Sequence, residues 1–155
     1  MKMSTRHVSV FTGLLFSFFM AVTPVVSAGE HDVAEIYVMV SLAVPGGDQV
    51  DPRLGQIREE LKSTFAPSSY EMLDEVRFDL DLQEQDSKPL PGDAHLFVQY
   101  MGNDDGKVNL NVRITQQGRE VLNTNFSIPR GGTIIVGGPP YKNGNLVLSL
   151  RTTLN

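Results

Sequence analysis

The chain has 155 residues, of which 41% are hydrophobic and 20% charged, and it contains no cysteine. This length and composition are typical of one globular domain and argue against a disordered, collagen-like or polytopic membrane protein. The lack of cysteine excludes disulfides, thiolate catalysis, iron–sulfur clusters and zinc fingers. With 18 acidic against 13 basic residues, the chain is poorly suited to bind nucleic acid or anionic lipid.

The first 28 residues have the layout of a secretory signal peptide. Lys2 and Arg6 form a positive start, an apolar run covers positions 8–26, and Ser27 and Ala28 provide short side chains at the expected cleavage site. Cleavage after Ala28 leaves 127 residues with a formal net charge of −7. We therefore expect a bacterial protein that is periplasmic or secreted, and a retained N-terminal anchor is the alternative.

Residues 29–34 are predicted to be a flexible lead, and residues 35–155 a single domain. Apolar residues dominate both alternating sets between positions 36 and 44, which predicts a central strand that is covered on both faces. Pro45, Gly46 and Gly47 end this strand.

Asp51 and Pro52 open the one predicted helix, because an aspartate caps free amides and a proline suits the first helical position. Its apolar stripe is expected to pack on a sheet, and Pro67 is expected to end it. The stripe consists of Leu54, Ile57, Leu61 and Phe65.

From position 70 the period of the pattern changes to two, which predicts a long strand with one apolar and one wet face. Residues 83–93 are polar and contain two prolines, so they are predicted to form a loop. The expected apolar face consists of Tyr70, Met72, Val76, Phe78, Leu80 and Leu82.

Further alternating runs lie at 96–100, 108–114, 122–128, 133–136 and 145–152. Hairpin-type turns, such as those at 103–106 and 116–118, separate them, so neighbouring strands should be antiparallel. We predict an α+β fold with a mainly antiparallel sheet, either curved or rolled into a partial barrel. It should have about seven strands, with one helix packed on it after the first strand. The last residues, 151–155, are candidates for an exposed sheet edge.

Arg77, Asp79 and Asp81 are predicted to project from one strand face. Two carboxylates about 6.6 to 7 Å apart along a strand suit acid–base chemistry such as sugar hydrolysis. That chemistry also needs a cleft and an environment that separates the two pKa values, and the sequence indicates neither. A solvated face with an Arg–Asp pair is the favoured interpretation.

Three other patterns have a chemical and a plain structural interpretation, and the structural one is favoured in each. The segment 103–106 (Asn-Asp-Asp-Gly) offers calcium ligands but matches a hairpin turn better. His31 and His95 lack the partners of a zinc site. The glycine pairs at 131–132 and 137–138 lack a following helix, so they indicate turns or bulges rather than a phosphate loop. Asn125 begins a glycosylation sequon.

The C-terminal region, from Asn123 through the segment 131–139 (GGTIIVGGP) to 145–148 (NLVL), resembles the ending of small exported bacterial proteins of unassigned function. Its glycine-flanked part is also similar to a hairpin of the outer-membrane secretin pore domain. This resemblance covers about 20 of the 127 mature residues and implies a role in envelope assemblies.

No catalytic, cofactor-binding or metal-binding residue is predicted. The favoured function is a non-catalytic protein-binding or assembly module of the bacterial envelope, which binds a partner or itself through a strand edge. The surface aromatics Tyr37 and Tyr141 are candidate contact residues for this function, although ordinary packing is the favoured explanation for both. The alternatives are a domain that binds a small ligand or calcium, and a small hydrolase that uses carboxylates.

Overall fold

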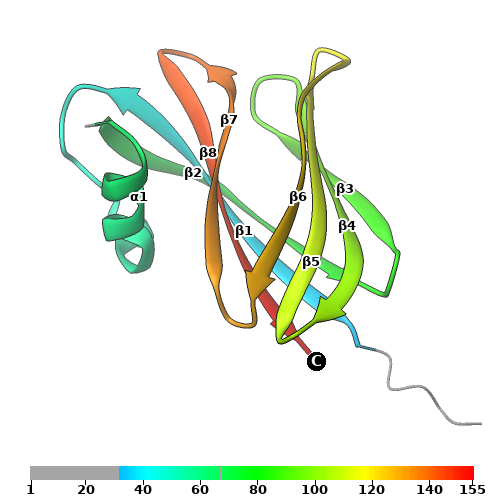
Figure 1. The fold of residues 1–155 in the computed structure, drawn as a ribbon. Coiled ribbons are helices and arrows are strands. Elements are labelled where there is room, and N and C mark those ends of the chain that lie inside the picture. The colour runs from blue at the N-terminus through cyan, green and yellow to red at the C-terminus, as the bar shows by residue number, and fades with distance from the viewer. Residues whose placement is uncertain (1–31, 67) are drawn as a thin grey trace, which may run out of the picture.

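The computed structural model describes residues 32–66 and 68–155; the predicted export signal and most of the predicted lead lie outside these residues. Eight strands form two four-stranded sheets in the described residues (Figure 1). Sheet A has the order β2-β1-β8-β7 and sheet B the order β3-β4-β5-β6. The strands are β1 (Ala34–Pro45), β2 (Ser68–Leu80), β3 (Gln85–Leu90), β4 (Ala94–Asp104), β5 (Lys107–Gln116), β6 (Arg119–Pro129), β7 (Thr133–Tyr141) and β8 (Gly144–Leu154).

All strand pairs within the two sheets are antiparallel. The predicted α+β class with a mainly antiparallel sheet is therefore confirmed. The sheets are two separate layers that are not closed into a barrel, and they hold eight strands rather than about seven. The chain crosses between the sheets at the β2–β3 and β6–β7 connections.

The predicted helix is present as a 3-10 segment, η1 (Pro52–Ile57), followed by α1 (Arg58–Thr64). Asp51 caps it as predicted, since its Oδ1 accepts a hydrogen bond from the Arg53 N–H at 3.0 Å. The helix lies on the face of sheet A that points away from sheet B (Figure 1), so the molecule has three layers.

β1 is a central strand, as predicted, with β2 on one side and β8 on the other. β8 lies between β1 and β7, so the C-terminal residues are an interior part of sheet A and not the exposed edge that the sequence suggested. Backbone hydrogen bonds between Val33 and Asn155, at 3.1 and 3.2 Å, extend this pairing beyond both strands. The two ends of the domain therefore hold each other in place.

The predicted single apolar face of residues 70–82 is wrong because β2 contains a bulge. Met72 faces Ser41 and Asp74 faces Val40, which leaves Leu73 as an extra residue. The extra residue changes which side chains point inward, since side chains alternate along a strand. Tyr70 and Met72 thus lie under the helix, Phe78 and Leu80 lie between the sheets, and Leu82 is 62% exposed beyond the strand.

The loop predicted for residues 83–93 contains β3, a six-residue strand paired with β4. The sequence pattern did not reveal β3, because a lysine and a proline interrupt the apolar alternation. Lys88 forms an ion pair with Asp86 at 2.9 Å and lies over the Phe78 ring at 5.6 Å from its centroid. Lys88 thereby covers the sandwich where β3 meets β2.

Two apolar clusters stabilise the layers. The smaller one joins the helix to sheet A and is built around Leu54, Ile57, Leu61 and Val147. Each fully buried aliphatic side chain contributes about 1.5 to 3 kcal/mol. The larger cluster lies between the sheets; among its members are Ile36, Val38, Val40, Phe78, Leu96, Val98, Tyr100, Leu110, Val112, Ile114, Leu148 and Leu150.

Neither helical segment in the described residues has the length and apolar character needed to cross a bilayer.

Candidate interaction site at a sheet edge

Each open sheet ends in two strands that have a neighbour on one side only. In this molecule they are β2 and β7 in sheet A, and β3 and β6 in sheet B. An unpaired strand edge accepts a strand from another chain unless it is short, charged, interrupted by proline, bulged or covered. The four edges of the described residues differ in these features.

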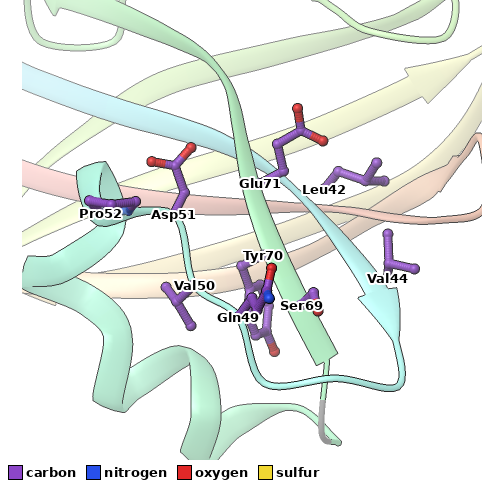
Figure 2. Close-up of a pocket in the computed structure, with 9 residues that line it drawn as sticks. All are labelled: Leu42, Val44, Gln49, Val50, Asp51, Pro52, Ser69, Tyr70 and Glu71. Atoms are coloured by element: carbon purple, nitrogen blue, oxygen red, sulfur yellow. The ribbon is translucent and has the colours of Figure 1, made fainter.

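A neighbouring loop covers the beginning of the β2 edge. The connection from β1 to η1 runs alongside β2 and forms a short parallel bridge between Val50 and Tyr70 (Figure 2). The Tyr70 N–H donates to the Gln49 carbonyl at 2.8 Å, and the Asp51 N–H donates to the Tyr70 carbonyl at 2.9 Å. The residues drawn in Figure 2 line a hollow of about 480 Å³ over this seam between loop and strand.

Asp51 and Arg53 continue the cover with their side chains, and we call this pair the clamp. Arg53 Nη2 donates to Asp51 Oδ2 at 2.7 Å and to the Met72 carbonyl at 2.9 Å. The Met72 N–H donates to Asp51 Oδ2 at 3.3 Å. The hydrogen bond from the Arg53 guanidinium is the main reason that the pKa of Asp51 lies well below its ordinary value. The clamp thus occupies both backbone groups of Met72 on the open side of β2.

The remainder of β2 and the edges β3 and β7 carry other protection. β2 contains five charged residues, and its register with β1 is interrupted by the bulge. β3 is short and contains Lys88 and Pro89. β7 contains two glycines and two prolines at 137–140, where its register with β8 shifts. These are the devices that block edge-to-edge pairing.

β6 lacks these devices over its central part. It is an 11-residue strand, and residues 121–127 (VLNTNFS) include no charged residue, glycine or proline. Its one irregularity lies at the beginning, where Leu122 faces Ile114 and Glu120 faces Thr115, so that Val121 is an extra residue. From Leu122 to Pro129 the register with β5 is continuous. We call residues 121–127 the β6 edge.

A hydrogen bond just beyond the end of β6 shows which way the backbone N–H and C=O groups of this strand point. The Arg130 N–H donates to the Gly106 carbonyl on the β5 side at 3.1 Å. Since backbone groups point alternately to the two sides of an antiparallel strand, the even-numbered residues from 128 to 122 also point toward β5. The odd-numbered residues direct their N–H and C=O groups to the open side. Those in the β6 edge beyond the bulge are Asn123, Asn125 and Ser127.

Amide side chains fix the register of β6 on the outer face of sheet B. Asn111 Nδ2 on β5 donates to the Oδ1 atoms of Asn123 and Asn125, at 3.0 and 2.8 Å. Ser127 Oγ donates to Asn109 Oδ1 at 2.7 Å. Neutral side chains therefore fix the position of β6 against β5.

The opposite face of the β6 edge is apolar and incompletely covered. Leu122 and Phe126 are partly buried against the core, Thr124 between them is exposed, and Val121 is 48% exposed. On the outer face, by contrast, a hollow of about 260 Å³ is lined by Asn109, Asn125 and Ser127 among others. β6 and β7 meet at their connection and diverge from there (Figure 1), so β7 does not pair with this edge.

The predicted carboxylate face is a solvated ion-pair surface. Arg77 Nε donates to Asp79 Oδ1 at 3.0 Å, and Arg77 Nη2 lies 2.9 Å from Glu35 Oε1. The hydrogen bond with Asp79 is the largest cause of a raised Arg77 pKa. Asp81 lies beyond β2, and its N–H donates to Glu84 Oε2 at 2.8 Å. Asp79 and Asp81 therefore make separate contacts, Asp79 with Arg77 and Asp81 through its backbone with Glu84.

The other patterns noted in the sequence have ordinary positions. The segment 103–106 forms the β4–β5 hairpin turn, in which Asp105 and Gly106 have positive φ angles of 48° and 71°. His95 is an exposed residue of β4 that faces Pro89, and His31 lies outside the described residues. Residues 32–66 and 68–155 hold no group of three or more potential ligands placed to bind a metal.

The two tyrosines differ in their surroundings. Tyr141 is partly buried and packs against the larger apolar cluster. Tyr37 is 37% exposed and lines a cleft of about 230 Å³ with Arg53, Glu75 and Arg151. A hydrogen bond with Glu75 is the main cause of the raised Tyr37 pKa. Charges of both signs line this cleft, so it favours no single class of ligand.

Sequence reasoning missed the β6 edge as a site, although residues 121–127 are visible in the sequence as an uncharged run without glycine or proline. Their significance depends on the strand order, which the sequence does not contain. Comparisons of the chain with protein-family models, with curated proteins and with solved structures found no match in any of the three. The resemblance to exported proteins and to the secretin hairpin stays a prediction.

Proposed function

We propose that this chain is an exported, non-catalytic module of the bacterial envelope that binds a protein strand along the β6 edge. In this mode of binding an extended segment joins a sheet, backbone hydrogen bonds supply affinity, and alternate side chains supply specificity. The observation that carries the proposal is the contrast among the four edges of the described residues. Three have blocking features, and β6 has none over residues 121–127.

Both faces of the β6 edge support this mode. The odd-numbered residues direct their backbone N–H and C=O groups to the open side of the strand. Asn111 holds the register of this strand in place. The even-numbered residues present Leu122 and Phe126, whose exposed parts an added strand would cover. The −7 net charge of the predicted mature chain disfavours polyanions and leaves protein as the partner class.

Site-specific photo-crosslinking in the native cells tests the proposal. A photo-crosslinking amino acid replaces Val121 on the β6 edge or, as the matched control, Gln85 on β3, the opposite edge of the same sheet. Both positions are exposed strand residues. We expect one discrete crosslinked species from position 121, none from position 85, and loss of the species in a Thr124→Lys background. Absence of a species from position 121, or equal products from both positions, contradicts the proposal.

A further inference from the structure

The side chains of the β6 edge have a nearly symmetric order. Reading outward from Thr124 in either direction, an asparagine comes first and a large apolar residue second: Asn123 and Leu122 on one side, Asn125 and Phe126 on the other. A sequence with this symmetry can pair with a second copy of itself in antiparallel orientation. The two-fold axis then passes beside Thr124, and both copies contribute the same patch.

This register places like with like at every position around the axis. Asn123 faces Asn125 of the second copy, and Leu122 faces Phe126 of the second copy. Apolar side chains in opposite positions stabilise an antiparallel pair, whereas like charges in such positions destabilise it. Because residues 121–127 carry no charge, no repulsion opposes the pairing at this edge despite the acidity of the whole chain.

The backbone hydrogen-bonding pattern is compatible with the same register. Asn123 and Asn125 direct their N–H and C=O groups to the open side, so the two Asn123–Asn125 pairs across the axis become hydrogen-bonded pairs. Thr124, whose backbone points toward β5, then meets its copy in a non-hydrogen-bonded pair, with the two Cα atoms about 4.5 Å apart. The Asn111 amide continues to hold both asparagine side chains from within its own sheet.

We infer that the partner of the β6 edge is a second copy of this chain, and that the two copies form a two-fold dimer whose B sheets join into one continuous sheet of eight strands. The inference rests on the proposed function, because it names the partner of the same edge. It explains why one strand edge of the described residues lacks protection, since a closed two-fold dimer covers that edge in both copies. A dimer of this kind removes both β6 edges from solvent.

Single cysteines test the register, since the chain has none of its own. Thr124→Cys places two sulfurs beside the axis, within the Cα separation of about 4.4 to 6.8 Å that a disulfide needs. Val121→Cys, at an exposed position off the axis, is the matched control. After mild oxidation of the exported chain, we expect covalent dimers from Thr124→Cys and monomers from Val121→Cys. Equal crosslinking of both variants overturns the proposed register.

Sedimentation of the wild type and of Thr124→Lys tests the dimer itself. We expect reversible dimerisation of the wild type. In Thr124→Lys association should be at least about tenfold weaker, because two ammonium groups face each other at the axis. Gln85→Lys adds the same charge on the opposite edge of sheet B and should dimerise like the wild type. Thermal unfolding of all three variants separates an effect on pairing from an effect on folding.

A monomeric wild type overturns the inference, and photo-crosslinking from position 121 then decides the fate of the proposed function. If a different protein is captured there, and Thr124→Lys abolishes the capture, the edge binds a heterologous strand. The proposed function then stands without the dimer. If nothing is captured, both fail.

Discussion

The two edges β2 and β6 show opposite ways of ending a sheet. At β2, a loop hydrogen-bonds to Tyr70, the Asp51–Arg53 clamp occupies the backbone of Met72, and charged side chains follow along the strand. At β6, neutral side chains line a strand with continuous register from Leu122 onward. One edge is thus closed by the chain's own loop and charges, while the other keeps the features of a pairing surface.

The largest effect is expected from loosening the helix that holds the β2 cover in place. Leu61 is fully buried beneath the helix. Leu61→Ala should lower the free energy of unfolding by about 2 to 5 kcal/mol, through lost burial and the remaining cavity. Lys62→Ala, at the exposed neighbouring position, should change it by no more than about 0.5 kcal/mol. Urea unfolding measures both, and a loss below about 1 kcal/mol for Leu61→Ala would contradict this packing.

Removing the clamp should open the β2 edge. Asp51→Ala removes the helix cap and the acceptor for the Met72 N–H, and it leaves the Arg53 guanidinium without its carboxylate. We expect a Tm lower by a few degrees and faster aggregation on heating, because the strand edge is then uncovered. The exposed Arg58→Ala variant is the control. Calorimetry with light scattering would refute the clamp's role if both variants behaved alike.

The stability that the clamp gives to the β2 edge should depend on pH, whereas the uncharged β6 edge has no such group. The pKa of Asp51 is lower in the folded chain than its ordinary value of 3.8. Its stabilising contribution is therefore complete above that ordinary value and is lost as the pH falls toward the folded-state pKa. Urea midpoints should fall more steeply below about pH 4 in the wild type than in Asp51→Asn. Parallel curves for the two proteins would show that Asp51 does not contribute in this way.

The smallest effect is expected from the amide contacts that fix the β6 register. Asn111→Ala removes the donor that serves Asn123 and Asn125. We expect a loss of about 0.5 to 1 kcal/mol, because these neutral hydrogen bonds are near the surface. The exposed turn variant Asn143→Ala serves as the control. Hydrogen exchange should then accelerate in β6 more than in β1, and uniform acceleration would assign Asn111 a general structural role.

The sequence predicted the elements better than it predicted their arrangement. Alternation and capping are local, so β1, the helix at Asp51 and the hairpin turn at 103–106 were found. The bulge at Leu73 was not predicted, because an extra residue leaves no mark on the composition of a strand. It nevertheless places Tyr70 and Phe78 on opposite faces of the sheet. β3 was missed because Lys88 and Pro89, which protect an edge, also obscure the pattern of a strand.

The candidate site depends on pairings between distant segments. The run 122–128 was predicted as a strand, but its place at an edge follows from the β1–β8 pairing, which puts the C-terminal strand inside sheet A. Likewise, the clamp joins Asp51 to Met72, 21 residues away. Such contacts set which edges are covered, and single-residue patterns do not encode them.

Residue-resolved hydrogen exchange of the β6 amides tests the pairing of two copies at this edge most directly. In the wild type, at concentrations where it associates, the outward-pointing amides of Asn123 and Asn125 should be protected. In Thr124→Lys they should exchange as free amides, while the amides of Phe126 and Ile128, which point toward β5, remain protected in both proteins. Equally fast exchange of the Asn123 and Asn125 amides in both proteins would contradict pairing of the β6 edge with a second copy.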